Sequence, residues 1–152
     1  MTAIIKFYLQ NGAYGFMSNF SRHPIYIADK IWPTTEHYFQ AQKFAGTEHE
    51  EAVRCASTPK QAALMGRDRT RPLRADWESV KDEVMREALK AKFTQHPELR
   101  QALLDTGDAL LIEHTKNDAY WADGGDGSGK NRLGELLMAL RAELSAARLD
   151  AP

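Results

Sequence analysis

Cysteine is nearly absent from this sequence, and long apolar runs are missing. Cys55 is the single cysteine among 152 residues, which excludes an intramolecular disulfide and a cysteine-rich zinc cluster. No stretch of eighteen apolar residues occurs, and the apolar part of the amino-terminal segment is too short for a secretory signal. We therefore expect a protein of the reducing cytoplasm without a membrane segment, in which Cys55 is a buried packing residue rather than a nucleophile.

An excess of charge of either sign is also missing. Lys and Arg total 20 against 21 Asp and Glu, which gives a formal net charge of −1. The overall charge therefore does not attract duplex nucleic acid or an anionic membrane, and an anionic ligand must be held locally. The densest basic run is RDRTRPLR, Arg67 to Arg74. Its composition fits a solvated connector and a phosphate-binding segment equally well.

Metal-binding patterns are lacking as well. Neither a pair of histidines at ligand spacing nor the oxygen pattern of a calcium loop occurs. We expect no metal and no cofactor. The histidines are interpreted as surface or capping residues, with His37 worth testing because it follows Glu36.

The length and composition predict one domain over residues 1–152. Hydrophobic residues make up 43% and charged residues 27%, as in ordinary globular chains. Periodicity and turn signals predict short strands at residues 3–9, 25–27 and 109–112. They predict helices at residues 36–44, 48–55, 59–65, 76–93, 97–104 and 132–148. The expected fold class is therefore a helix-dominated α+β single domain with a few short strands.

The helix that begins near Glu36 carries a polar stripe. At about 100° per residue, Glu36, Gln40 and Lys43 lie within roughly 60° of one another, with Phe39 at the edge. By spacing alone this stripe is more often a solvated face with weak side-chain pairs. Trp32 and the aromatic segment before it change that estimate, because aromatic walls beside convergent polar groups are typical of small-ligand pockets.

A glycine-rich segment precedes the last predicted helix. GGDGSGKN, Gly124 to Asn131, nearly matches the loop pattern of nucleotide triphosphatases. Asn131 replaces the hydroxyl residue that would bind magnesium, and no buried strand leads into the loop, so we discard that function. A weaker expectation remains, in which backbone N–H groups bind a phosphate at the start of the last helix.

Several segments together resemble one family. They are YGFMSNF, WPTTEHYFQAQKF, GRDR with PLR, DWESVK with VMREALKAKF, and NDAYW with GGDGSGKNRLGELLM. They resemble the NADAR superfamily, most closely its bacterial YbiA-type N-glycosidases, over about residues 6 to 145. The resemblance implies a helix-rich α+β fold. It also implies hydrolysis of the N-glycosidic bond between a ribose phosphate and a base-like amine, in reactive early intermediates of riboflavin biosynthesis, and hence control of metabolite damage.

The resemblance also implies roles for individual residues. The catalytic carboxylate of the family falls on Glu36, its companion lysine on Lys43, and an acidic residue on Asp118. The two tryptophans associated with the pocket fall on Trp77 and Trp121. The family pattern usually has glycine directly after the second tryptophan, where this chain has Ala122. If that position needs a left-handed backbone, alanine would strain the loop by about 1 kcal/mol or more.

The chemistry of such a bond fits these residues. Breaking a ribosyl C–N bond builds positive charge on the sugar, which the Glu36 carboxylate would stabilise. Asp118 or Lys43 would supply the proton to the departing amine, and the sequence does not rank them. Tryptophans would stack on the base, while arginines, Arg69 among them, or the glycine loop would hold the phosphate. The expected substrate contacts are Asn19, Arg22, Trp32, Phe39, Gln40, Arg67, Trp77, Trp121 and Asn131.

Two alternatives remain open at this stage. One is removal of ADP-ribose from guanine, an activity that relatives in the family have, with modified nucleic acid as the substrate. The other is a module that binds ADP-ribose or a nucleotide without turnover. The expected partner is in each case a phosphoribosyl or ADP-ribosyl compound and not a membrane, and the sequence predicts no oligomeric state.

Overall fold

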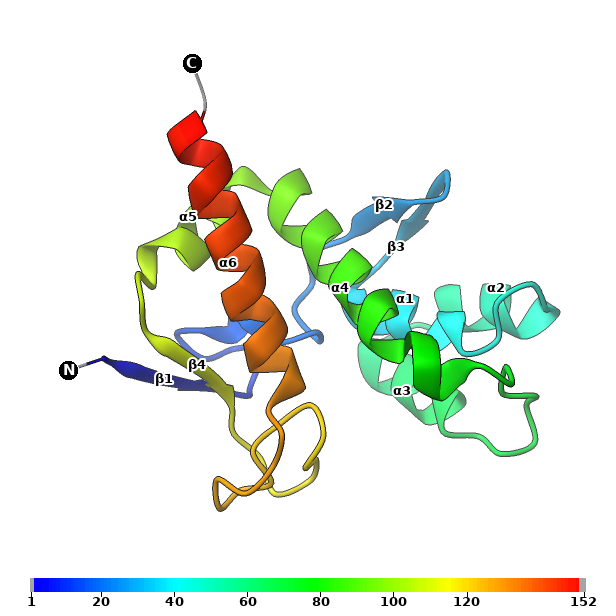
Figure 1. The fold of residues 1–152 in the computed structure, drawn as a ribbon. Coiled ribbons are helices and arrows are strands. Elements are labelled where there is room, and N and C mark those ends of the chain that lie inside the picture. Colours follow the sequence, from blue (N-terminus) through cyan, green and yellow to red (C-terminus); the bar gives the residue numbers. More distant parts are fainter. Residues whose placement is uncertain (1, 151–152) are drawn as a thin grey trace. The chain divides into compact units, whose positions relative to one another are not determined.

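A computed structural model describes residues 2–150 of the chain. The elements follow in the order β1 (Ile4–Phe7), the 3-10 turn η1 (Gly15–Met17), β2 (Ile25–Ile27), β3 (Lys30–Trp32), α1 (Thr35–Gln42), α2 (Glu48–Arg54), α3 (Pro59–Gly66), α4 (Trp77–Gln95), α5 (Pro97–Asp105), β4 (Leu110–Glu113) and α6 (Arg132–Asp150) (Figure 1). Within the described residues, helices dominate and the short strands form two sheets of two strands each. The predicted helix-dominated α+β class is confirmed.

Three helices begin at threonine caps. The hydroxyl oxygen of Thr34 accepts a hydrogen bond from the N–H of His37, and Thr58 accepts one from Gln61 in the same way. Thr47 caps α2 through the N–H of His49. Because each cap satisfies a backbone donor that the helix itself leaves unpaired, the starts of these helices are fixed by local sequence.

The chain divides into two compact units. One is formed by the described residues up to Ser18 together with those from His96 onward. In it β1 pairs with β4 in parallel, with Ile4 opposite Leu110, and α6 packs on β4 and on α5. Its core contains Phe7, Leu103, Leu111, Leu133 and Leu137, all buried.

The second unit comprises Asn19–Gln95 and is built around α1. This short helix contacts α2, α3, α4 and β3, so all of its faces are covered. Every residue from Thr35 to Ala41 is buried, including the polar ones. A helix that is buried on all sides must satisfy its polar side chains internally, which makes those side chains candidates for function.

The hairpin of β2 and β3 differs from the sequence prediction. A turn was expected around Ala28 and Asp29, and both residues adopt left-handed backbone angles, with φ of 56° and 63°. The strand that follows, β3, was not predicted. Its pairing with β2, in which Trp32 lies opposite Ile25, gives order to three residues that have no periodicity of their own.

Candidate functional site

The amino-terminal end of α1 fixes the position of Glu36. The backbone N–H of Glu36 donates to the main-chain oxygen of Asn19 at 3.2 Å. The hydroxyl of the preceding Thr35 donates to the side-chain oxygen of Asn19 at 2.8 Å. Asn19 was predicted to contact substrate, and in the structure its side chain joins the loop before β2 to the first turn of α1. Glu36 is therefore held at a defined point.

Glu36 and Gln40 form a buried pair one turn apart. Gln40 Nε2 donates to Glu36 Oε2 at 2.7 Å, and the two residues are only 7% and 4% exposed. The solvated-face interpretation of the stripe therefore does not hold. A carboxylate taken out of water needs donors to remain charged, and the carboxamide of Gln40 supplies one.

Lys43 completes the stripe on the last turn of the same segment. Its Nζ donates to the main-chain oxygen of Gly66 at 3.3 Å and lies 5.9 Å from the ring centroids of both Phe39 and Trp77. Burial lowers the pKa of Lys43 from 10.5, and the negative charge of Glu36 opposes this shift without cancelling it. The ammonium group is thus a stronger acid than an ordinary lysine, and it lies to one side of the Phe39 and Trp77 pair, whose ring centroids are 5.1 Å apart.

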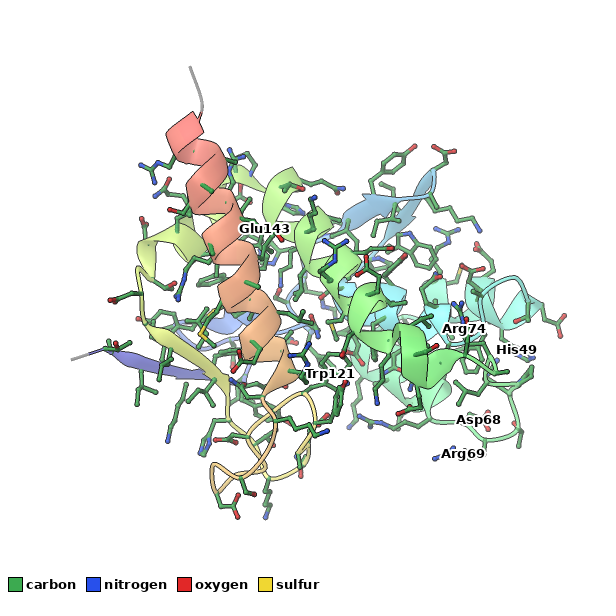
Figure 2. All side chains as sticks on the ribbon, in the orientation of Figure 1. His49, Asp68, Arg69, Arg74, Trp121 and Glu143 are labelled. Carbon is green, nitrogen blue, oxygen red and sulfur yellow. The ribbon has the colours of Figure 1, made fainter. Side chains whose placement is uncertain are left out.

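A cavity of about 470 Å³ opens beside Lys43. The connector between α3 and α4 forms much of its wall, and Figure 2 shows the side chains of Asp68 and Arg69 on this connector. The lining residues are Lys43, Phe44, Gly66, Arg67, Asp68, Arg69, Arg71, Pro72, Leu73, Trp77 and Glu78. Four cations against two carboxylates favour an anionic ligand, and the ring of Trp77 offers an apolar surface in the same cavity.

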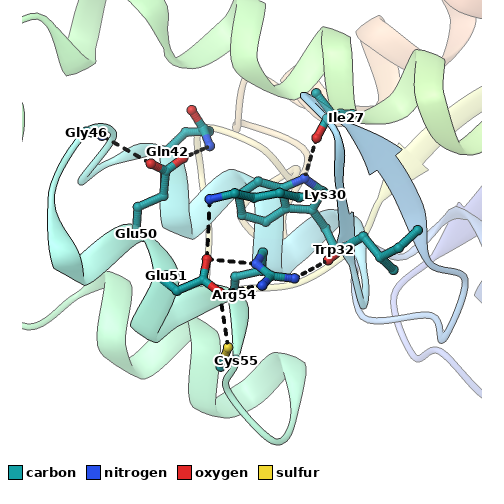
Figure 3. A network of polar contacts seen from close by, with 10 residues as sticks. Ile27, Lys30, Trp32, Gln42, Gly46, Glu50, Glu51, Arg54 and Cys55 are labelled. Atoms are coloured by element: carbon teal, nitrogen blue, oxygen red, sulfur yellow. Dashed lines mark hydrogen bonds and ion pairs between the residues drawn. The ribbon is translucent and has the colours of Figure 1, made fainter.

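Trp32 has a structural role in this arrangement. Its indole Nε1 donates to the main-chain oxygen of Ile27 at 3.1 Å (Figure 3). It is 1% exposed, and its ring packs edge-on against Tyr38. The expectation that Trp32 contacts the substrate base does not agree with this geometry, because the hairpin and α1 already cover the ring. Arg22 is exposed, and its role stays a prediction.

His37 is buried and anchors α1. Its Nε2 lies 3.0 Å from the main-chain oxygen of Ala56, which only accepts, so this nitrogen carries the proton. Its Nδ1 then accepts from the hydroxyl of Thr34 at 2.8 Å. Burial lowers the pKa of His37, and the positive charge of Arg22 adds a smaller effect in the same direction. His37, the one histidine excepted from the surface or capping interpretation, is therefore a neutral anchor of the helix.

The remaining predicted residues belong to the other unit. Asp118 Oδ1 accepts from the backbone N–H groups of Tyr120 and Trp121, each at 2.8 Å. The ring of Trp121 packs edge-on against Tyr120. Asn131 uses both ends of its carboxamide on the backbone, accepting from Glu113 N at 3.0 Å and donating to Leu111 O at 2.9 Å. Asp118 and Asn131 thus hold the loop in shape, and their roles toward substrate stay predictions.

The glycine-rich loop does not offer the phosphate cradle that was expected. The N–H groups of Gly127 and Gly129 donate to the main-chain oxygen of Asp123, at 3.1 Å and 2.8 Å. At the start of α6, the N–H groups of Arg132 and Leu133 donate to the carbonyls of Tyr120 and Trp121. The loop folds back on itself and consumes these donors, so the expectation of an anion site there was wrong.

Ala122 fits this loop without backbone strain. It is completely buried and is not among the described residues with left-handed φ. Its main-chain oxygen accepts from the N–H of Asn131 at 3.0 Å. The strain considered for alanine at this position therefore does not arise.

Asp123 is the central acceptor of the loop. Its side chain, 5% exposed, accepts from the N–H groups of Gly125 at 2.9 Å and Thr115 at 3.2 Å, and from His114 Nδ1 at 2.7 Å. Burial disfavours the charged form, but these hydrogen bonds prevail and hold the pKa of Asp123 below 3.8. The stability that the ionised Asp123 side chain gives to the folded protein is fully present above the ordinary carboxyl pKa, and it is lost as pH falls through the lowered pKa.

Replacing Asp123 by alanine is expected to lower the free energy of unfolding by about 2–4 kcal/mol, because buried N–H donors lose their acceptor. Urea denaturation followed by circular dichroism measures this. Asp126→Ala is the control in the same loop, since Asp126 is exposed and caps only Ser128. Equal losses in the two variants would contradict the central role of Asp123.

The cysteine, the possible metal ligands and the helix lengths were also addressed by the sequence predictions. Cys55 is exposed, contrary to the expected burial, because it lies at the end of α2 with its Sγ toward Glu51. Within the described residues, no cluster of three or more histidine, cysteine or acidic side chains could hold a metal. Of the helices described, none has the length and apolar character needed to cross a membrane.

Sequence reasoning missed two residues of the second unit. Gly66 was predicted only as the end of a helix, whereas it contacts both Gln40 and Lys43. Lys92 is 1% exposed, and its Nζ donates to Ser21 Oγ at 2.7 Å, with its pKa lowered to about 7 by burial. The available signal was its helical spacing from Met85 and Leu89, which places a lysine on the apolar face of α4.

Comparison with known proteins identifies the family. The NADAR domain model matches residues 6–145. The chain is 60% identical over 142 residues to the N-glycosidase YbiA of Escherichia coli (strain K12), covering 93% of this chain and 89% of that protein. An NMR structure of the E. coli protein YbiA matches with a TM-score of 0.92 and 57% identity, covering 100% of this chain and 91% of that one. A riboflavin biosynthesis protein of Vibrio vulnificus is 43% identical over 92% of this chain, which spans 38% of that protein.

These matches confirm the resemblance inferred from the sequence motifs. The chain belongs to the NADAR family. Its enzyme class is that of the related N-glycosidases, a hydrolase acting on N-glycosyl bonds.

Proposed function

We propose that the protein hydrolyses the C–N glycosidic bond of phosphorylated ribosylamino-pyrimidines of riboflavin biosynthesis and releases ribose 5-phosphate. The observation that carries this proposal is the buried Glu36 carboxylate, which accepts a hydrogen bond from Gln40 and whose charge acts on Lys43. Lys43 lines the cation-rich cavity, whereas Glu36 is not among the lining residues. The riboflavin-related name of the Vibrio relative supports the substrate class. Removal of reactive intermediates would limit metabolite damage in the cytoplasm.

Glu36 is the catalytic carboxylate in this proposal. As the C–N bond lengthens, positive charge develops on the sugar, and a carboxylate stabilises it most strongly where water is largely excluded. A water oxygen forms the new bond to the anomeric carbon, and Glu36 accepts the proton that this water loses. The electron pair of the broken bond remains on the amine nitrogen, which takes a proton.

Lys43 is the proposed donor of that proton. Its lowered pKa makes it a better acid than an exposed lysine, and transfer of its proton leaves a neutral amine in a partly apolar site. The ring of Trp77, which lines the cavity, would stack on the planar base, with Phe39 supporting that ring edge-on at 5.1 Å. We also propose that residues 1–152 form one domain. Asp118, Trp121 and Asn131 belong to the unit that does not contain Glu36, and their roles toward the substrate stay predictions.

Arg67 and Arg69 are the proposed phosphate ligands. Replacing either by methionine, which keeps much of the side-chain volume, is expected to raise KM about 10- to 100-fold with a smaller change in kcat. Steady-state kinetics with the phosphorylated substrate measures this. Arg86→Met is the control, because Arg86 is an exposed residue of α4 paired with Glu83. The arginine variants should also lose their defect on the dephosphorylated nucleoside, and a defect that persists there would argue against phosphate binding.

The function itself is tested with a panel of ligands. Purified protein is incubated with aminouracil ribose 5-phosphates, and released ribose 5-phosphate is quantified by mass spectrometry. Release of ribose 5-phosphate supports the proposal. Turnover confined to an oligonucleotide carrying ADP-ribose on guanine would replace the proposal by the ADP-ribosyl-guanine alternative. Binding of ADP-ribose without turnover of any ribosylated base would replace it by a binding module.

A further inference from the structure

We propose that Gly66 is a positioning residue that sets the arrangement of both Glu36 and Lys43. It ends α3, and α3 packs on α1. Its missing side chain leaves room for the carboxamide of Gln40, which holds Glu36, while its main-chain oxygen accepts from Lys43 Nζ. This inference rests on the proposed roles of Glu36 and Lys43, and it adds the residue that places them.

The space around Gly66 excludes any side chain. A Cβ atom built there would lie 2.6 Å from Gln40 Cδ and 3.0 Å from Gln40 Cβ, and closer still to Gln40 Oε1. Such approaches are far inside van der Waals contact, so one of the two groups would have to move. Gln40 lies within the buried α1 and cannot shift its backbone readily, so its carboxamide would be displaced.

Conformation does not explain this glycine. Gly66 is not among the glycines with left-handed φ, unlike Gly107, which follows α5 and has φ of 64° and open space around it. The residue that caps α3 is Arg67, in a right-handed helical conformation. Alanine would suit the backbone at residue 66 and has the higher helix propensity. The glycine is therefore explained by its contact with Gln40.

The orientation of the Gln40 carboxamide is fixed by its hydrogen bond to Glu36. Its Nε2 faces the Glu36 carboxylate, since the opposite orientation would place a carbonyl oxygen against a carboxylate oxygen. Its Oε1 is then buried toward Gly66 and has no hydrogen-bond partner among the described residues. A buried acceptor without a partner is destabilising, which indicates that the pairing with Glu36 is retained at the expense of stability.

Gly66 therefore contacts residues that fix the positions of both proposed catalytic groups. Glu36 is tied to Gly66 through Gln40, and Lys43 is tied to Gly66 directly. Displacing the carboxamide would take away the hydrogen bond that Gln40 donates to Glu36, while the Lys43 contact to the Gly66 main-chain oxygen stays in place. The carboxylate and the ammonium group would then lose their fixed arrangement.

A double-mutant cycle tests this proposal. Gly66→Ala is expected to lower kcat about 100-fold, the size of effect that a displacement of about 1 Å produces at a reacting centre, with little change in KM. Circular dichroism should show that the variant remains folded, so that the loss of kcat does not reflect unfolding. A Gln40→Ala background removes the two closest atoms, Oε1 and Cδ, and keeps only Gln40 Cβ at 3.0 Å. In that background Gly66→Ala should change kcat less than about 3-fold. Equal fold-changes in the two backgrounds, or an unchanged kcat, would overturn the proposal.

A second measurement separates this proposal from the proposed reaction. The pKa of Lys43 is followed by NMR of its side-chain methylene groups, which requires no substrate. Gly66→Ala should lower that pKa further, because the Glu36 charge that raises it moves away, and in the Gln40→Ala background it should have no such effect. Gly12→Ala is the control, since a Cβ at that position meets only ordinary contact at 3.5 Å. A Lys43 pKa unchanged by Gly66→Ala contradicts the positioning role, whereas wild-type protein inactive on every substrate contradicts only the proposed function.

Discussion

Replacing Glu36 by glutamine is expected to lower kcat on the phosphorylated substrate by about 10³-fold, while the protein remains folded. Glutamine keeps the shape of the side chain and can still accept a hydrogen bond from Gln40 Nε2, so the variant removes the charge and little else. The positive charge on the sugar then lacks its partner, and the attacking water lacks its base. KM should change much less, because the phosphate ligands are untouched.

Stability should respond in the opposite direction. Glu36 is 7% exposed, and a buried carboxylate carries a desolvation cost that a neutral amide avoids. The melting temperature of Glu36→Gln is therefore expected to equal or exceed that of the wild type, which is typical of residues kept for activity. Differential scanning calorimetry measures this next to the kinetic assay.

Glu50→Gln is a matched control for this variant. Glu50 accepts from Gln42 Nε2 at 2.9 Å and from the N–H of Gly46 at 3.1 Å, so it is also a glutamate paired with a glutamine in the same unit (Figure 3). Glu50 is not among the charged groups that shift the pKa of Lys43, whereas Glu36 is. Its replacement should leave kcat within about 3-fold of wild type. A similar loss of kcat in both variants, or full activity of Glu36→Gln, would show that Glu36 does not have the proposed role.

The sequence predicted those parts of the fold that depend on neighbouring residues. The starts of α1, α2 and α3 follow from Thr34, Thr47 and Thr58, whose hydroxyls act within three residues of themselves. The pairing of β1 with β4 could not be predicted in this way, because it joins Ile4 to Leu110 across most of the chain. Local patterns hold no information on such a contact.

In the candidate site, too, features set by local sequence could be predicted and features set by packing between helices could not. The helical spacing of Glu36, Gln40 and Lys43 predicted a shared face, and it is present. The burial of that face could not be predicted, because it results from packing of α2, α3 and α4 around α1. The role of Gly66 could not be predicted from the sequence for the same reason, since its contact with Gln40 joins two helices. The glycine loop misled the prediction, because a run of glycines does not reveal that Asp123 accepts their N–H groups.

The pH dependence of the reaction gives the second large effect, and it concerns Lys43. If its ammonium group donates the proton to the leaving amine, activity requires the protonated form. Because burial lowers the pKa of Lys43 below 10.5, kcat/KM should fall as pH rises through that lowered value, at a lower pH than an ordinary lysine would titrate. Glu36 raises this pKa, so the residual activity of Glu36→Gln should fall off at a lower pH than that of the wild type.

Two substitutions of Lys43 separate charge from proton transfer. Methionine removes both and is expected to lower kcat about 10²- to 10⁴-fold, the usual range for loss of a general acid. Arginine keeps the positive charge but does not give up its proton at these pH values. Lys43→Arg should therefore retain phosphate binding, lose most of kcat and show no alkaline limb in its pH profile.

The measurement is the pH dependence of kcat and of KM for the wild type, Lys43→Met and Lys43→Arg. An alkaline limb that persists unchanged in Lys43→Arg would exclude Lys43 as the acid and leave Asp118 as the predicted donor, to be examined in Asp118→Asn. Loss of the limb together with a KM close to wild type would assign the proton to Lys43, because only the ionisable group and not the local charge has been removed.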